Sequence, residues 1–388
     1  MEKIKYLYNK LLLNKNFHSG HLRTFLILYS ENKKKDIQFN ISFKNEIKEP
    51  NAIIKTEYIK NIIKNKYTKI IIINNSEIYK INTQSLIINK IKNKLTFNKI
   101  FDYYVLNNLN INYITTQLFT KKYFKITVKS LQKKPIHIIN ITTNTNNCTN
   151  NKYIDIENNT TCTLYDLNFI KLDTNNYFIN RFIHIKNNTN IKYNLFVKSH
   201  NKNDNILNIF TKLDKNSNLS ISDLISNNNI SCYYNFFLVG IQSKVKQIIF
   251  KFFKEESTDY RESNIFHYNN NTKSNTNIGI ISYQKSNFIF NGNIHVATLS
   301  KNTDAHLKCA GLILTNNAKI EFNPNMFINN NDVKCTHGAS IGNMNENILN
   351  YLKSRGVNNN NAISILTNSF INTFKKQNKF LQYIAQYE

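Results

Sequence analysis

The chain has 388 residues, of which 41% are hydrophobic and 12% aromatic, so it can bury a sizeable core and is not disordered in composition. Its 51 basic residues against 24 acidic ones give a net charge of +27, but only four of the basic residues are arginine. The lysines are spread without a basic block, and lysine lacks the planar fork that reads bases and phosphates. We therefore expect no nucleic-acid partner, and keep a lysine-rich nucleic-acid-binding solenoid as a minor alternative. Asparagine makes up about a fifth of the chain, which we attribute to an A+T-rich genome.

The five cysteines are odd in number and irregularly spaced, which argues against a disulfide framework and for a reducing compartment. The first residues contain no apolar run of the length of a secretory signal, and no segment approaches ~18 uncharged apolar residues. We expect no membrane insertion. The expected location is the cytoplasm of a bacterium with a reduced, A+T-rich genome, and a plastid is the alternative.

Residues 1–115 carry mixed signals and are expected to form a small α/β region. Apolar spacing predicts short helices at 4–13, 58–64 and 98–108. Residues 69–81 are rich in isoleucine around an Asn-Asn-Ser sequence, which predicts a β-hairpin.

Residues 116–342 show short alternating runs of apolar residues separated by asparagine-rich turns. Two stretches nearly repeat each other, YIDIENNTTCTLYDL (153–167) and FIHIKNNTNIKYNLF (182–196). A spacing of 28–29 residues between equivalent turn positions is typical of a solenoid, in which the inward isoleucines of each coil stack on those of the next. Asparagine suits the corners because it tolerates the left-handed backbone conformation. A β-sandwich is the alternative architecture.

Residues 343–388 change to helical spacing. Helices are predicted at 344–355 and 361–376, with Gly356 ending the first in the left-handed conformation and the four asparagines 358–361 forming a turn.

Cys335 and His337 are the most specific candidates for a chemical site. They stand two residues apart in an alternating segment, so both side chains are expected on one face of a strand. A structural metal site needs four ligands, and His306 and Cys309 are the nearest further candidates. If a metal binds, the missing ligands come from a partner chain. The alternative is a buried cysteine beside an exposed histidine with no metal.

Other catalytic signatures are missing from the sequence. The eight glycines form neither of the phosphate-binding patterns GxGxxG and GxxxxGK[ST], and no paired-acid or Cys/His nucleophile arrangement stands out. We expect a protein that is not an enzyme.

The C-terminal third resembles the SufB/SufD family of iron–sulfur assembly scaffold proteins. The resemblance rests on motifs between residues 290 and 357: NGNIHV, TDAH, LILTNNAKIEFNP, DVKCTHGASIG and YLKSRG. Within the family, a histidine preceded by Cys-Ser/Thr and followed by glycine is the SufD-like form, which Cys335-Thr336-His337-Gly338 matches. The resemblance extends, in order, from about residue 69 to 374.

This resemblance implies a right-handed parallel β-helix and a non-catalytic scaffold. It implies that Cys335 and His337 lie at the edge facing a SufB-like partner, as partial ligands of a transient iron–sulfur cluster that SufB completes. It also implies that the C-terminal helices dock against a SufC ATPase, which would hydrolyse the ATP. The residues expected to contact SufC are Tyr351, Leu352, Arg355, Gly356, Leu366 and Phe370. A purely structural partner subunit, without any cluster ligand, is the competing interpretation.

Overall fold

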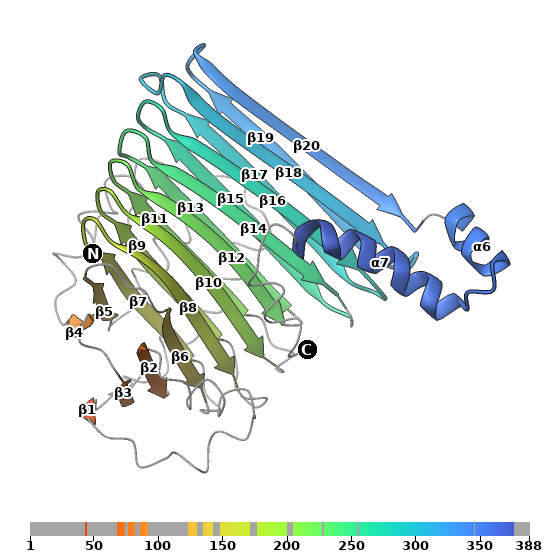
Figure 1. Cartoon of the computed structure of the whole chain (residues 1–388), viewed down its shortest axis with the longest axis horizontal. Coiled ribbons are helices and arrows are strands. Elements are labelled where there is room, and N and C mark those ends of the chain that lie inside the picture. The colour runs from red at the N-terminus through yellow and green to blue at the C-terminus, as the bar shows by residue number, and fades with distance from the viewer. Residues whose placement is uncertain are drawn as a thin grey trace, which may run out of the picture.

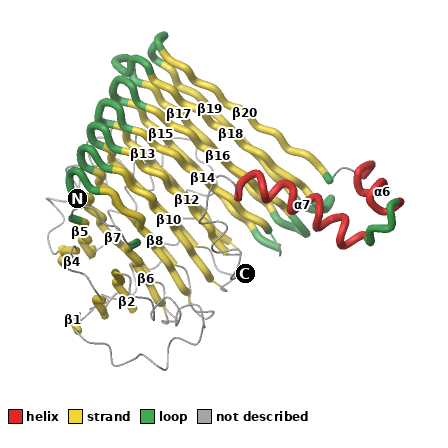
Figure 2. The backbone as a smooth tube through the Cα atoms, viewed as in Figure 1, coloured by secondary structure: helices red, strands yellow, loops and turns green. Residues whose placement is uncertain are grey.

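The structure, a computed structural model, consists of two β-sheets packed face to face with two helices at the C-terminal end (Figures 1 and 2). The described residues are 43–44, 68–73, 77–81, 86–91, 123–129, 135–142, 148–170, 177–199, 205–226, 229–253, 256–344 and 346–375. Each coil runs up one sheet, turns tightly, and runs along the other sheet (Figure 1).

The two sheets, which we call sheet A and sheet B, have eleven and nine strands. In the order in which they pair, the strands of sheet A are β1 (Phe43–Lys44), β3 (Glu77–Ile81), β2 (Thr68–Ile73), β6 (Ile136–Thr142), β8 (Thr161–Ile170), β10 (Asn190–Ser199), β12 (Asn218–Ser226), β14 (Lys244–Phe252), β16 (Lys273–Ser282), β18 (Thr303–Ile313) and β20 (Val333–Asn343). Those of sheet B are β19 (Lys319–Ile328), β17 (Asn287–Val296), β15 (Thr258–His267), β13 (Asn229–Leu238), β11 (Asn205–Leu213), β9 (Tyr177–Ile185), β7 (Cys148–Ile156), β5 (Tyr123–Val128) and β4 (Leu86–Ile91).

Strand pairing confirms the solenoid and excludes the β-sandwich. From β5 to β20 every strand pairs in parallel with the strand two places further along the chain. Asn190 lies opposite both Thr161 and Asn218, so the coil lengths are 29 and 28 residues, the period predicted from the sequence. At the last coil the period has grown to 32 residues, because Asn287 lies opposite Lys319.

The tight turns show why asparagine takes the place of glycine. Asn159, Asn188 and Asn216 have φ values of 56°, 56° and 51°, in the left-handed region that asparagine tolerates best after glycine. These residues also bond from coil to coil: the Asn216 amide donates to the Asn188 side-chain oxygen at 3.1 Å. Genome bias therefore does not account for all of the asparagine, because this turn conformation favours it, although Gln242 and Gln284 adopt the same conformation in two other turns.

The interior between the sheets is mainly apolar and continuous along the solenoid. Ile154 lies opposite Ile183, and Ile156 opposite Ile185, and all four are fully buried. The predicted inward stacking of these isoleucines is thus confirmed. Burial of such side chains, at about 25 cal/mol per Å² of apolar surface, is the main stabilising contribution to the coils.

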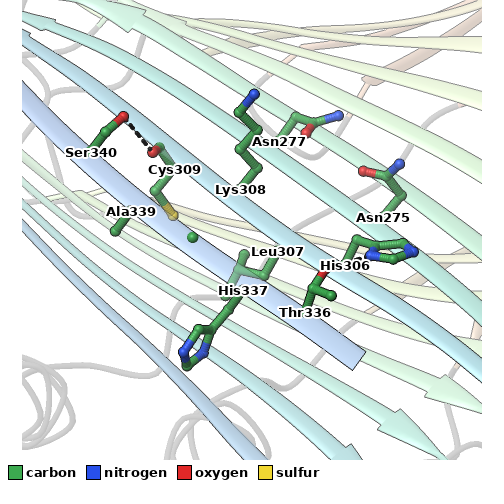
Figure 3. A pocket seen from close by; sticks show the side chains of 11 residues that line it. Asn275, Asn277, His306, Leu307, Lys308, Cys309, Thr336, His337, Ala339 and Ser340 are labelled. Carbon is green, nitrogen blue, oxygen red and sulfur yellow. Dashed lines mark hydrogen bonds between the residues drawn. The ribbon is translucent and has the colours of Figure 1, made fainter. Parts of the chain in front are cut away.

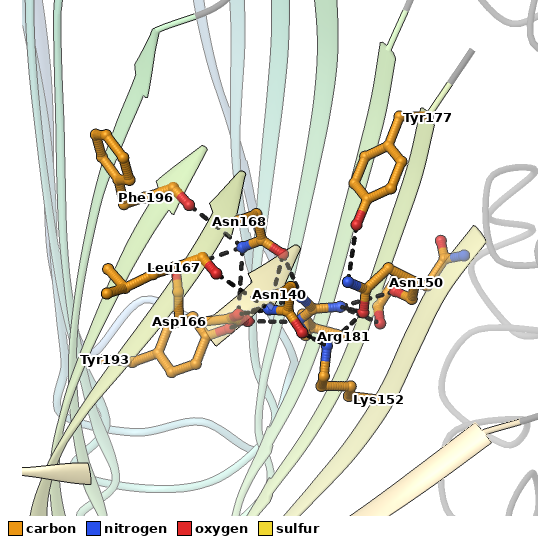
Figure 4. A network of polar contacts seen from close by, with 11 residues as sticks. Asn140, Asn150, Lys152, Asp166, Leu167, Asn168, Tyr177, Arg181, Tyr193 and Phe196 are labelled. Carbon is orange, nitrogen blue, oxygen red and sulfur yellow. Dashed lines mark hydrogen bonds and ion pairs between the residues drawn. The ribbon is translucent and has the colours of Figure 1, made fainter. Parts of the chain in front are cut away.

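A buried polar network interrupts the apolar interior near the first coils (Figure 4). The Asp166 carboxylate accepts hydrogen bonds from Arg181, from the Tyr193 hydroxyl at 2.6 Å and from the Asn140 amide at 2.7 Å. Burial alone would raise the pKa of Asp166, but the charges of Arg181 and Lys152 outweigh it and lower the pKa. For Lys152, burial and the nearby Arg181 lower the pKa well below its ordinary value.

The described part of residues 1–115 consists of strands that extend the two sheets. β2 and β3 pair antiparallel, with Ile73 opposite Glu77, which confirms the predicted hairpin, and β2 also pairs in parallel with β6. The helices predicted at 4–13, 58–64 and 98–108 lie outside the described residues.

The two C-terminal helices are α6 (Glu346–Ser354) and α7 (Asn359–Lys375). Gly356 has φ 85°, and the N–H groups of Gly356 and Val357 donate to the carbonyls of Lys353 and Leu352 at 2.9 and 3.1 Å, which ends α6 in a Schellman motif as predicted. The second helix starts two residues earlier than predicted. The Asn358 side chain accepts a hydrogen bond from the Asn361 N–H at 2.8 Å and so caps α7, drawing the following asparagines into the helix.

Helix α7 lies across the outer face of sheet A (Figure 1). Phe374 packs there with Ile248, Phe250 and Ile281. A side chain at Gly279 would overlap the Phe374 ring, so β16 needs a glycine at this contact. Among the described helices, none is long and apolar enough to cross a membrane.

Candidate functional site: the open end of the solenoid

The solenoid ends in a coil whose outer edges carry no further strand of the described chain. β19 and β20 are the terminal strands of sheets B and A. Large apolar side chains are exposed along them: Phe327 at 51%, Ile341 at 46% and Ile328 at 40%. An unpaired strand edge beside exposed apolar side chains is a template for another chain.

Cys335 and His337 lie on the inner side of β20, as the sequence pattern predicts. Their partners in β18 are Ala305 and Leu307, which are both buried in the core. Cys335 is half-buried and packs against the core, whereas His337 is exposed because no coil follows. Both side chains therefore face the space that a further coil would fill.

The Cys335 thiol is not activated by its surroundings. Burial raises its pKa, with a hydrogen bond from the Ala305 backbone acting in the opposite direction. A metal binds the thiolate, so the thiol form must lose a proton on ligation. Neutral imidazole needs no such step, which favours His337 as the readier ligand of the two.

Of the two further ligand candidates, His306 does not join this site, whereas Cys309 lies on the inner face but inside the core. Residues three apart in a strand point to opposite faces. Cys309 is buried in the core, while His306 lies on the outer face of sheet A, where it contacts Asp304 and Thr336 (Figure 3). Within the part of the chain that the structure describes, no three His, Cys, Asp or Glu side chains are grouped to hold a metal ion.

Ladders of identical side chains run through sheet B to the open edge, a feature that the sequence analysis missed. The side-chain amides of Asn264, Asn293 and Asn325 each donate to the asparagine of the preceding coil, beginning at Asn235, over 3.0, 2.8 and 3.0 Å. The asparagine spacings of 29, 29 and 32 residues were the available signal. The last carbonyl oxygen, on Asn325, is left at the edge.

An aromatic ladder ends at the same edge. The ring centroids of Phe266 and His295, and of His295 and Phe327, are both 4.6 Å apart, and the rings are nearly parallel. Burial lowers the pKa of His295 to about 4, so it stays neutral and stacks like an aromatic residue. Phe327 exposes its outer face where the next ring of the ladder would lie.

The residues predicted to contact an ATPase fall into two groups. On α6, Tyr351 is 57% exposed, and the guanidinium of Arg355 lies 5.3 Å from its ring centroid; Leu352 is half-buried and Gly356 forms the helix end. On α7, Leu366 and Phe370 are half-buried, and Phe370 packs against Phe374 within this chain. Ile348 and Ile365, which were not predicted, are exposed at 44% and 49%.

The fold and the open end together define a structural class: a two-sheet parallel β-solenoid whose last coil presents a thiol and an imidazole at an unpaired edge. Residues 137–370, more than half of the chain, match the family described as SUF system FeS cluster assembly, SufBD core domain. The chain belongs to this family of iron–sulfur cluster assembly proteins, and it is SufD-like.

Individual relatives match over shorter stretches. The iron–sulfur cluster assembly protein SufD of Escherichia coli is 34% identical over 86 residues, 22% of this chain and 20% of its own length. The chloroplastic protein ABCI7 of Arabidopsis thaliana is 33% identical over 91 residues, 24% and 19% of the two chains. An iron–sulfur cluster assembly SufBD family protein of Staphylococcus epidermidis is 25% identical over 178 residues, 45% and 38%. The matched stretches thus span less than two fifths of each relative's length.

Proposed function

We propose that this chain is the SufD-like, non-catalytic scaffold subunit of an iron–sulfur cluster assembly complex. In that complex it pairs with a SufB-like chain across its open end and carries a SufC-type ATPase on its C-terminal helices. The cluster is cargo, held transiently between the two solenoids. A reducing compartment, the cytoplasm of a bacterium or a plastid, is the proposed location.

The observation that carries this proposal is the half-built site on the inner side of β20. Cys335 and His337 face the position of a missing coil, and no third protein ligand lies near them within the described residues. A scaffold that shares its cargo with a partner needs this arrangement: ligands at a boundary rather than inside a closed site. The two ladders that stop at Asn325 and Phe327 support pairing by strand addition at this edge.

Contact with the ATPase is supported by the exposed apolar side chains of the helices. Ile348, Tyr351 and Ile365 are each more than 40% exposed on these helices. Phe370 has a different part in this proposal, because its ring packs against Phe374 and holds α7 to the solenoid.

The test is co-expression of this chain with its SufB-like and SufC-like partners, followed by anaerobic measurement of iron and acid-labile sulfide in the purified complex. His337→Ala is expected to leave the size of the complex unchanged and to reduce its iron and sulfide severalfold. Cys335→Ala is expected to have a smaller effect, because its thiol must first be deprotonated.

His306→Ala is the matched control. It removes the same side chain from the neighbouring strand, but on the outer face, so the cluster content is expected to stay normal. A normal cluster content in His337→Ala would leave the purely structural role as the better account. If no complex forms with the partners at all, the pairing itself is refuted.

The proposed contact with the ATPase is tested by a variant on α6 and a control variant on the same helix. Tyr351→Ala removes the most exposed aromatic ring of the helix and is expected to release the ATPase subunit while the two solenoids stay paired. Lys353→Ala, on the same helix and also exposed, is expected to retain it. Equal retention by both variants would exclude this surface as the contact.

A further inference from the structure

A second polar site lies on the outer face of sheet A, on the other side of the strands from Cys335 and His337 (Figure 3). Three neighbouring strands place outward residues there in register. They are Lys273, Asn275 and Asn277 of β16, Asp304, His306 and Lys308 of β18, and Lys334, Thr336 and Gly338 of β20. A groove of about 550 Å³, which we call the outer groove, is lined by the second and third residues of each strand together with Leu307, Cys309, His337, Ala339 and Ser340.

Among these nine outward residues, which we call the grid, the only acidic side chain is that of Asp304, and its charge is already neutralised. Asp304 accepts a hydrogen bond from Lys273 at 2.9 Å, and its other oxygen bonds His306 at 2.7 Å. The Lys273 hydrogen bond lowers the pKa of Asp304, so the carboxylate stays ionised and holds both partners. The second ring nitrogen of His306 contacts the Thr336 hydroxyl at 2.6 Å. This chain of contacts fixes one wall of the outer groove.

The remaining charge in the grid is positive. Lys308 and Lys334 form no ion pair with any described residue, and on β14 Lys244 and Lys246 lie opposite Lys273 and Asn275 and extend the positive surface. No atom lies within 4 Å of the position that a side chain at Gly338 would take. There is therefore open space over the sheet directly beside Lys308, its partner in the register.

We propose that the outer groove binds a small phosphate-type anion, with Lys308 as the principal contact and the Asn275 amide as a further donor. Ammonium, amide and hydroxyl groups are the usual donors to phosphate oxygens. The volume of the groove lies in the range of small-molecule sites, about 300–1,000 Å³.

The residues that line the outer groove favour a small phosphate over a nucleic acid. No phenylalanine or tyrosine lines the outer groove, so a base has no ring on which to stack. Arginine, the preferred reader of base edges, is missing from the grid as well. The two sites adjoin at β20, since His337 also lines the outer groove, but the side chains of Lys308 and Thr336 lie on the opposite face of the sheet from those of Cys335 and His337. Variants of each site can therefore be tested separately.

The experiment is calorimetric titration of the full chain with inorganic pyrophosphate at low salt. Saturable binding at one site per chain is expected, with a Kd below about 1 mM, as for a few charge-assisted hydrogen bonds. Lys308→Ala is expected to weaken binding by about fivefold or more. Lys215→Ala, which removes the same charge from an exposed turn, is expected to change it by less than about twofold.

Histidine NMR signals locate the site. Addition of pyrophosphate is expected to shift the imidazole signals of His306, on the groove wall, and to leave those of His267, buried in the interior, unchanged. The proposal is overturned if binding does not saturate by about 10 mM, or if Lys215→Ala weakens it as much as Lys308→Ala does. Tighter, Lys308-dependent binding of single-stranded DNA would also overturn it, in favour of a nucleic-acid surface.

Discussion

The middle coils and the last coil are built from the same repeat but have different surroundings. In β9, a strand of a middle coil, every residue is buried on both faces, and Ile183 and Ile185 are covered by coils on either side. In β20, only Val333 and Cys335 retain partial burial. The asparagine and aromatic ladders nevertheless continue unchanged into the last coil. The last coil thus has the side chains needed to stack against one more coil, but the described residues of this chain include no such coil.

The largest difference in stability is expected for the buried ion pair between Asp166 and Arg181, the latter in β9. Arg181→Met leaves the Asp166 carboxylate buried without its main partner, which typically costs about 3–5 kcal/mol. Lys192→Met, on the exposed face of β10, is expected to change stability by less than about 0.5 kcal/mol. Chemical denaturation of both variants measures the difference. Two similar values would contradict the view that interior charges in the middle coils are held by their partners.

The contact of α7 with sheet A allows a second comparison of two variants, one at the contact and one away from it. Gly279→Ala places a methyl group inside the Phe374 ring and is expected to destabilise the docked helix by about 1–3 kcal/mol. Gly338→Ala, near the end of sheet A, meets open space and is expected to have little effect. Hydrogen exchange of residues 359–375 reports the undocking. Combining Gly279→Ala with Phe374→Ala should remove most of the steric effect, and failure of this rescue would mean that the ring is not the obstacle.

The histidine buried among the middle coils makes stability depend on pH. Burial lowers the pKa of His267 from 6.5 to about 3, and both its ring nitrogens contact hydroxyls, of Thr272 at 2.8 Å and of Ser274 at 2.9 Å. Between these two pH values the unfolded chain binds a proton that the folded chain does not. Stability is therefore lost as the pH falls below 6.5, by at most about 1.4 kcal/mol per pH unit from this group.

Denaturation at pH 7 and pH 5 checks this dependence. His267→Leu is expected to reduce the loss on acidification by up to about 2 kcal/mol relative to the parent chain. An unchanged pH dependence in His267→Leu would assign the acid sensitivity to other groups.

The smallest difference in stability is expected between variants of two residues in one asparagine ladder. Asn264→Ala removes a buried amide that bonds to coils on both sides, at an expected cost of about 1–2 kcal/mol. Asn325→Ala removes the last member at the exposed edge, with an expected cost below about 0.5 kcal/mol in the isolated chain. If the edge pairs with a partner, the cost of Asn325→Ala should rise in the complex, which denaturation of both forms measures.

The fold could be predicted because its determinants are local and repeated. Alternation with period two marks the strands, and the asparagine turns mark a period of 28–29 residues, as the pairing of Asn190 with Thr161 and Asn218 confirms. The start of α7 was misplaced because Asn358 acts as a cap rather than as part of a longer turn.

The candidate site was only partly predictable. The shared face of Cys335 and His337 followed from alternation alone. The spacing of His306 and Cys309 allows only one of them on the inner face, and that residue, Cys309, is buried in the core. The contacts of Asp166 with Arg181, and of His306 with Thr336, depend on the register between coils, which the sequence sets only through small differences in coil length. Lysines that look dispersed along the chain gather on sheet A for the same reason.

The constancy of the coil has a consequence for how such a chain evolves. Each strand touches only the coils before and after it, and residues 190–217 make up one complete period between the turn positions Thr189 and Ser217. Duplication or loss of one such unit would lengthen or shorten the body by one layer and leave the terminal face as it was. Natural selection can therefore vary the overall size of these proteins freely while keeping the end that meets a partner.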